Sequence, residues 1–434
     1  MSSPTGNRLR LVHLTEMTEA ERAGLFRRSA VPDPQVRKIA QTICEEVRRD
    51  GDRAMKILAR RHGGGYFPVP ESELAAAARR MPVVVEALEG ARRQIEAFHL
   101  RQIPSDVHTE TLPGIAIARR WSPLQRVGAY VPGGKAAYPS TVLMTVTPAK
   151  VAGVAEVVVA TPAGADGSVS DATLAACWVA GADEVWAMGG AGAVAALAYG
   201  TEQLQPVEKI VGPGNQWVTA AKLAVFGDCG IDLPAGPSEV LVLADHSADP
   251  RLVAADLLCQ AEHGPDSPAV LVTTAPQLAA RVEVALEEQL ATLERREILA
   301  EALANHGMTV IASDMAQAIS FANRYAAEHV SLLTSDLDTH AKAITAAGSV
   351  YVGRWSAESA GDYATGANHV LPTGGLAACY GPLSVEDFGS WRQEQRLTRD
   401  GLAEILPIIT RLADVEGFTA HRRAAEIRFS AQGA

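Results

Sequence analysis

Short apolar runs alternate with longer helical patterns over most of the chain. Seven runs have the length of buried strands and lie at 156–162, 183–190, 208–214, 239–245, 268–274, 308–313 and 349–353. Stretches rich in alanine and with helical periodicity separate most of them. Such alternation is typical of α/β units with a mostly parallel sheet. Because the series is too long for one small sheet, we predict two Rossmann-like α/β domains.

The two ends of the chain have a different pattern. A helix is predicted from Asp33-Pro34 to a break at Gly51-Asp52, and further helices reach residue 101 with a division near Pro82. After about residue 382 the strand-like runs stop, and 384–434 reads as an Arg-rich helical tail with little core of its own. Such a tail needs another surface to lie on, either its own body or a second subunit.

These patterns predict four parts of the chain. They are an N-terminal arm (1–24), a first α/β domain (25–129 with 239–381), a second α/β domain with most of the glycine-rich turns (130–238), and the helical tail (382–434).

Composition narrows the class of protein. Apolar residues make up 47% of the chain and aromatic residues 5%, which favours small-residue packing of helices on sheets. A net charge of -11 argues against a nucleic-acid partner. No apolar run is long enough for a membrane span, and the first residues lack the apolar core of a signal peptide. The five cysteines form no CxxC pair, which fits a reducing cytoplasm and excludes a Cys-based zinc site.

The first candidate for chemistry lies at the end of a predicted helix that begins at Asp249-Pro250. Gln260 and His263 are three residues apart near its C-terminal end, where the helix dipole favours a cation. An amide oxygen and an imidazole can hold a metal if other residues complete the shell. For an isolated Gln-x-x-His, a histidine that caps the helix is the simpler interpretation.

Two further pairs combine a carboxylate with an imidazole. Glu328 and His329 precede an apolar run, and can activate water and accept a proton from an alcohol. Asp362 and His369 lie in 361–375, a loop rich in Gly, Asn, Thr and Pro. Taken alone, the adjacent Glu328-His329 pair is more simply explained by a structural role. The alternative for Asp362 and His369 is an Asx-turn and a surface histidine.

Glu416 and His421 lie between two helices of the predicted tail. Each is a candidate ligand or substrate contact, although a capped helix start explains them as well. One set of these candidates would form a mixed nitrogen and oxygen shell suited to zinc: Gln260, His263, Asp362 and His421. Zinc has no redox chemistry, so another group would have to take the electrons.

Glycine-rich turns offer a place for that group. Gly190–Ala195 matches G-x-G-x-x-A between a predicted strand and helix, but no acidic residue follows about 20 positions on, where the dinucleotide fingerprint needs one. Similar turns lie at 127–135, 212–215 and 235–239. Several in one α/β region predict a cleft that can bind a nicotinamide cofactor.

Taken in order along the chain, these segments resemble the histidinol dehydrogenase family: VGAYVPGG, GPGN, AGPSEV, QAEHGPDS, EHV, SAGDYATGANHVLPT and EGFTAH. The resemblance covers nearly the whole chain and is weakest over the first 100 residues. It implies oxidation of L-histidinol through L-histidinaldehyde to L-histidine, with two NAD in turn and one zinc ion per subunit. It also implies a homodimer in which the tail of one subunit completes the site of the other.

The resemblance assigns roles residue by residue. It implies that Glu328 and His329 are general bases. In the mechanism that we expect, His329 accepts the alcohol proton and Glu328 activates water onto the aldehyde. The implied zinc ligands, which also surround the substrate, are Gln260, His263, Asp362 and, from the partner subunit, His421. Further implied substrate contacts are Ser238, His369 and Glu416, and implied NAD contacts are Tyr130 and Asn215. Zinc and substrate would then belong to the first α/β domain and NAD to the second.

One position departs from the family. The chain reads GGAGA at 189–193 where the family usually reads GGAQA, so the glutamine that faces NAD is replaced by Gly192. The replacement also creates the G-x-G-x-x-A match, which is therefore partly accidental. We expect it to affect NAD affinity rather than the chemistry.

Three other functions are compatible with parts of the pattern. The nearest is a family relative that oxidises another alcohol. A zinc hydrolase with Glu328 activating water would leave the glycine-rich turns without a purpose. A non-catalytic binding protein would not need both the proton-transfer pair and the ligand set.

Overall fold

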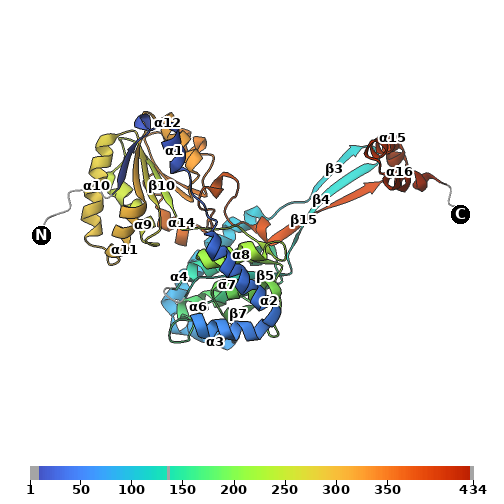
Figure 1. The fold of residues 1–434 in the computed structure, drawn as a ribbon, viewed down its shortest axis with the longest axis horizontal. Helices are drawn as coiled ribbons and strands as arrows, with labels where there is room; N and C mark the ends of the chain where they lie inside the picture. Colours follow the sequence, from blue (N-terminus) through green and yellow to red (C-terminus); the bar gives the residue numbers. More distant parts are fainter. Residues whose placement is uncertain (1–8, 134–136, 431–434) are drawn as a thin grey trace. The chain divides into compact units, whose positions relative to one another are not determined.

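The computed structural model describes residues 9–133 and 137–430, and the chain divides into two compact units (Figure 1). The first unit comprises Met1–Gln102 and Leu124–Phe388, and the second comprises Ile103–Pro123 and Gly389–Ala434. Parts of three predicted segments lie outside the described residues, namely 1–8 of the arm, 134–135 of a glycine-rich turn and 431–434 of the tail. No helix in the described ranges is long and apolar enough to cross a membrane.

One six-stranded sheet of the first unit is built mainly from residues 126–231. Its order is β2 (Phe67–Val69), β7 (Glu184–Ala187), β6 (Glu156–Thr161), β5 (Arg126–Tyr130), β8 (Lys209–Val211) and β9 (Gly230–Ile231). All neighbours are parallel except β2 and β7. The central strands are apolar and buried, as required where helices cover both faces.

Seven helices surround this sheet. They are α2 (Pro34–His62), α3 (Glu71–Arg80), α4 (Pro82–His99), α5 (Pro139–Ala152), α6 (Asp171–Ala180), α7 (Gly190–Tyr199) and α8 (Gln216–Val225). Of these, α2 packs against α7 and α8, while α3 and α4 pack against α6. The predicted grouping of 25–129 with 239–381 is therefore wrong for α2–α4, because the apolar face of α2 is buried in the core of this sheet.

The other six-stranded sheet is wholly parallel. Its order is β1 (Arg10–His13), β12 (Gly307–Ile311), β11 (Ala269–Thr273), β10 (Val240–Ala244), β13 (His329–Leu333) and β14 (Ser349–Val352). One face packs on α9 (Pro250–Ala261), α10 (Pro276–Leu290) and α11 (Arg296–His306), and the other on α12 (Met315–Tyr325). Two mostly parallel sheets with helices between the strands confirm the predicted α/β class. Part of the predicted arm also joins this sheet as β1.

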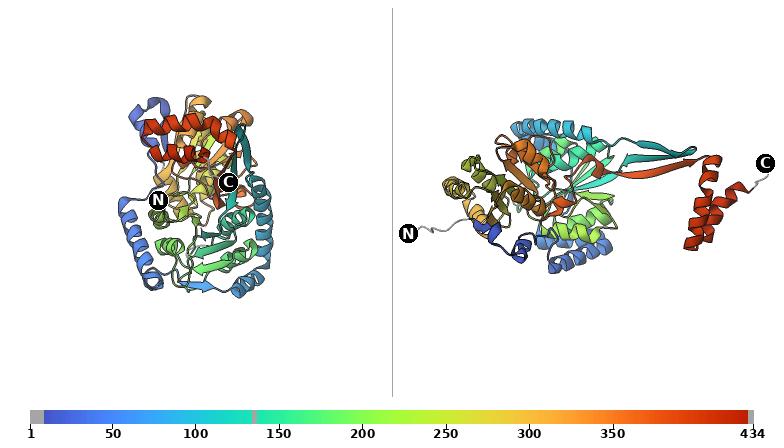
Figure 2. Two further views of the ribbon diagram at one scale, coloured as in Figure 1. Left: turned by 90° about the vertical axis from the view of Figure 1, so that its right-hand side faces the viewer. Right: turned by 90° about the horizontal axis from the view of Figure 1, so that it is seen from above.

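The second unit combines a small sheet with a helical hairpin. The antiparallel strands β15 (Gly389–Leu397), β4 (Ile115–Pro123) and β3 (Val107–Leu112) lie in that order. Helices α15 (Arg399–Glu416) and α16 (Thr419–Glu426) pack side by side (Figure 2). The tail therefore begins with a strand rather than a helix, because β15 pairs with β4 over nine residues and needs no apolar run to do so.

Candidate active site

The centre of the site lies at the amino ends of β10 and β13. Parallel pairing of Val240 with His329 brings the preceding residues, Glu239 and Glu328, side by side. All three residues Glu239, Glu328 and His329 are buried. The main-chain N–H of Glu239 donates to Oε2 of Glu328 at 2.9 Å, and the carbonyl oxygen of Glu239 accepts from the main-chain N–H of His329 at 3.2 Å. One residue thus holds both members of the predicted proton-transfer pair.

The tautomer of His329 follows from the same residue. Nδ1 of His329 is 3.3 Å from the carbonyl oxygen of Glu239, and since a carbonyl only accepts, Nδ1 carries the proton. Nε2 is buried and has no hydrogen-bonding partner among the described residues. Burial lowers the pKa of His329 to about 3, with a smaller contribution from His263. The imidazole is therefore neutral and presents the lone pair of Nε2 to a proton donor.

Glu328 is a carboxyl in a site that disfavours its charge. Burial raises the pKa of Glu328 well above the ordinary value of 4.5, and the charges of Glu239 and Asp362 act in the same direction. Hydrogen bonds from the main chain of Glu239 and the side chain of Ser238 oppose the rise. A carboxylate with a raised pKa is a stronger base, as activation of water requires.

Three of the four predicted metal ligands belong to one region of the first unit. Gln260 is in the last turn of α9, completely buried, and neither its amide oxygen nor its nitrogen has a partner among the described residues. His263 lies two residues beyond the helix end and is exposed. Asp362 is on α14 (Glu358–Tyr363), which packs against α9. Burial raises the pKa of Asp362, while His369 and His263 oppose the rise, so the carboxyl and both imidazoles interact.

The donor chemistry at this place fits a zinc ion. An unpartnered buried amide costs about 1–3 kcal/mol, and a cation held by its oxygen would offset that cost. Over the described residues, no group of three or more His, Cys, Asp and Glu side chains is placed to hold a metal. The predicted ligand set would not form such a group, because one of its members is a glutamine and another, His421, belongs to the second unit.

His369 connects two elements of the first unit. Its Nδ1 is 3.0 Å from the main-chain oxygen of Asp362, and its Nε2 is 3.4 Å from the hydroxyl of Thr141 on α5. The predicted loop 361–375 therefore places an imidazole between α14 and α5.

Glu358 is a candidate that the sequence did not reveal. Its side chain is 1% exposed, and neither carboxylate oxygen has a partner in the described part of the chain. Burial raises the pKa of Glu358 well above 4.5, and Asp362, Glu328 and Asp256 add to the rise. The available signal was its position four residues before Asp362, which places both on one helical face.

The candidate cofactor residues lie at the carboxyl edge of the other sheet. Tyr130 ends β5, and its hydroxyl accepts from the main-chain N–H of Gly190 at 3.2 Å. Gly212 follows β8 with φ 108°, and a Cβ there would lie 2.2 Å from the main-chain oxygen of Tyr130, so only glycine fits. Strands β5 and β8 flank the point where the strand order reverses, which is where α/β sheets bind ligands. Asn215 caps α8 with its side-chain oxygen, which leaves its amide nitrogen as a donor.

Gly192 has a different environment. It is buried within α7, and a Cβ there would lie 2.9 Å from Cδ1 of Leu58 and 3.3 Å from the sulfur of Met55, both on α2. The positive φ in this turn belongs to Gly190, not to Gly192. Any side chain at this position would therefore meet α2 first.

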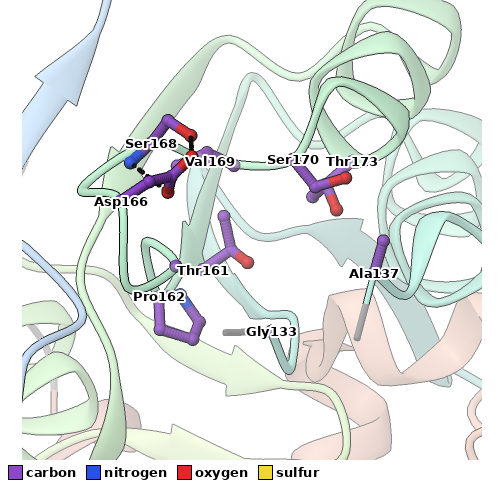
Figure 3. Close-up of a pocket in the computed structure, with 10 residues that line it drawn as sticks. Gly133, Ala137, Thr161, Pro162, Asp166, Ser168, Val169, Ser170 and Thr173 are labelled. Atoms are coloured by element: carbon purple, nitrogen blue, oxygen red, sulfur yellow. Dashed lines mark hydrogen bonds between the residues drawn. The ribbon is translucent and has the colours of Figure 1, made fainter. Parts of the chain in front are cut away.

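A cavity of about 250 Å³ opens at the carboxyl ends of β5 and β6 (Figure 3). Gly133, Thr161 and Pro162 line one part, and the loop 164–170 with the start of α6 lines the rest. Asp166 in this loop accepts from Ser168. Tyr130, Gly192 and Asn215 do not line the cavity, which lies one strand away from the reversal point.

Glu416 and His421 both lie in the second unit. Glu416 is the last residue of α15, His421 is on α16, and both side chains are exposed. The ring of His421 stacks on Phe418 with centroids 5.1 Å apart.

A parallel α/β architecture with a glycine-rich sheet edge is typical of enzymes that bind nucleotide cofactors, and Glu328 and His329 add two buried groups able to accept protons. Comparison with known proteins is more specific: the family model for histidinol dehydrogenase matches residues 26–429. The chain belongs to the histidinol dehydrogenase family.

Individual relatives agree with this assignment. A histidinol dehydrogenase from Haloarcula marismortui is 46% identical over 96% of this chain and 99% of its own, and one from Methanothermobacter thermautotrophicus is 43% identical over 95% and 97%. The crystal structure of histidinol dehydrogenase from Elizabethkingia anophelis has a TM-score of 0.92 at 35% identity, covering 98% of each chain.

Proposed function

We propose that this protein oxidises L-histidinol through L-histidinaldehyde to L-histidine, with two NAD in turn and one zinc ion per subunit. The observation that carries the proposal is the state of His329, whose Nδ1 proton is bonded to Glu239 and whose Nε2 is buried without a partner. Such a nitrogen suits a base that takes a proton from a substrate hydroxyl as hydride leaves the adjacent carbon.

The two bases divide the reaction. His329 accepts the proton of the alcohol at Nε2 while hydride leaves the adjacent carbon. The product of this first step is the aldehyde. Glu328, whose pKa is raised, then takes a proton from the water that adds to the aldehyde carbon. The resulting hydrate loses the second hydride and becomes the carboxylate. Both proposed bases are hydrogen-bonded to Glu239 and are therefore held at one place. The aldehyde would then not have to leave that place between the two steps.

Gln260, His263 and Asp362 would hold the zinc ion together with His421 of the partner subunit. The bound metal would fix the imidazole and amine of the substrate. Glu358, with two unpartnered oxygens, is an acceptor for an N–H of the substrate amine. Ser238, His369 and Glu416 remain proposed substrate contacts, and Tyr130, Asn215 and the position of Gly192 remain on the proposed NAD side.

A homodimer is supported by the second unit. Ile408, Leu412 and Val415 on α15 are 58%, 56% and 80% exposed, although they lie on a helix whose apolar pattern calls for a partner surface. We propose that this unit packs on a second copy and brings Glu416 and His421 to its site. We place the enzyme in the cytoplasm, in keeping with its free cysteines.

The test is NADH absorbance after addition of L-histidinol, with and without NAD, and after chelation. We expect NAD-dependent turnover that is lost on chelation and restored by zinc. Full activity in protein shown by elemental analysis to be free of metal would contradict the zinc proposal. No NADH from the zinc-loaded protein would contradict the proposed substrate.

A further inference from the structure

The catalytic geometry depends on Glu239, and Glu239 is itself held by a distant residue. Its main chain is hydrogen-bonded to Glu328 and His329, while its side chain is buried and 2% exposed. A backbone segment can hold two catalytic groups only if it is fixed in turn.

The side chain of Glu239 is fixed by two donors. One carboxylate oxygen accepts from the guanidinium of Arg28, and the other accepts from the main-chain N–H of Gly374 at 3.0 Å. Burial raises the pKa of Glu239, and the charge and hydrogen bond of Arg28 oppose that rise. Without Arg28, the carboxylate of Glu239, which lies next to Glu328, would lose the cation that forms an ion pair with it among the described residues.

Arg28 is anchored at its other end. Its guanidinium donates to the main-chain oxygen of Tyr325 and stacks on the Tyr325 ring, with Cζ 3.4 Å from the ring centroid. Tyr325 ends α12, three residues before Glu328. The side chain therefore spans the two chain segments that enter β10 and β13, each of which carries part of the site.

We propose that Arg28 is a positioning residue that holds Glu239, and through its main chain fixes Glu328 and His329 for proton transfer. The proposal rests on the function proposed above. It gives a role in the reaction to a segment that lies before α2.

The experiment compares Arg28→Ala with Arg27→Ala, a control on the exposed neighbour. A loss of about 100-fold in kcat is expected for Arg28→Ala, with KM for L-histidinol changed less than about threefold, because small displacements of catalytic groups act on the rate. Millimolar guanidinium should restore part of the rate at constant ionic strength. Arg28→Ala and Glu239→Gln combined should lose no more than the larger single loss, because both act through one bond.

A second readout does not depend on turnover. Nitrogen-15 spectra of histidine-labelled protein, assigned with His329→Asn, should show the Nδ1-protonated form of His329 in the wild type and in Arg27→Ala, and its loss in Arg28→Ala. If Arg28→Ala does not fold, Arg28→Lys should fold and show the same direction of change, since it keeps the charge but not the two-pronged geometry.

Two outcomes would overturn the proposal: a folded Arg28→Ala with wild-type kcat, or an unchanged His329 spectrum. If the wild type makes no NADH from L-histidinol, the proposed substrate is wrong, and the spectrum alone then decides whether Arg28 positions His329.

Discussion

The carbonyl oxygen of Glu239 lies 3.3 Å from Nδ1 of His329 and thereby decides which nitrogen of the imidazole carries the proton and which keeps a free lone pair. The same residue donates its N–H to Glu328. A single peptide segment at the start of β10 thus sets the tautomer of His329 and the orientation of Glu328.

The raised pKa of Glu328 predicts a pH dependence. The carboxyl is protonated below its raised pKa and ionised above it, and only the ionised form can take a proton from water. The rate of histidinaldehyde oxidation should therefore fall as pH drops through a value above 4.5. His329, with its pKa lowered to about 3, should add no limb near pH 6.5. The rate of oxidation of supplied histidinaldehyde, measured as a function of pH, tests this. A fall in rate centred at or below pH 4.5 would count against the role assigned to Glu328.

Gly192→Gln should destabilise the fold. From sequence, restoring the family residue predicts roughly fivefold tighter NAD binding through one hydrogen bond. The structure instead places Leu58 and Met55 where the new side chain would begin, and overpacking costs about 1–3 kcal/mol. Denaturant unfolding measures the loss, and Leu58→Ala in the same chain should recover part of it. Unchanged stability together with tighter NAD binding would support the sequence-based expectation.

Glu358→Gln should weaken recognition of the substrate amine. Hydrogen bonds to charged groups contribute about 1.5–3 kcal/mol, so kcat/KM for L-histidinol should fall roughly 10- to 150-fold. Loss of a buried, unpartnered charge should leave the fold as stable or more so. An imidazolyl alcohol without the amine is the matched control, and its kcat/KM should be the same for both proteins. Equal losses with both alcohols would assign Glu358 a role other than amine binding.

A site shared between subunits predicts complementation. His263→Ala and His421→Ala should each be inactive as pure dimers. When the two variants are refolded together in equal amounts, half of the dimers are mixed. Half of the sites in these mixed dimers are intact, so about a quarter of wild-type activity should return. No recovery, with mixed dimers confirmed by mass spectrometry, would mean that His421 serves its own subunit.

The sequence patterns predicted those strands and helix ends that depend on neighbouring residues in the chain. The continuous apolar runs at 156–161 and 240–244 became buried strands, and Asp249 caps α9 as its place before Pro250 predicts. By contrast, β15 was missed because one of its faces is wholly polar and the other carries only Trp391 and Leu397 as apolar side chains, so its pairing with β4 is what makes it a strand.

The part of the candidate site that could not be predicted from the sequence depends on contacts between residues that are distant along the chain. Arg28 and Glu239 are 211 positions apart, and Leu58 meets Gly192 across two helices. No spacing along the chain signals such pairs. The proposed acid–base pair could be predicted from sequence because Glu328 and His329 are adjacent.

The number of NADH molecules formed per L-histidinol consumed tests the division of roles most directly. The wild type should give two. Glu328→Gln should approach one, with L-histidinaldehyde accumulating, because removing a general base slows its own step by about two to four orders of magnitude and leaves the His329 step intact. Two NADH from Glu328→Gln, with both half-reactions slowed equally, would contradict the account.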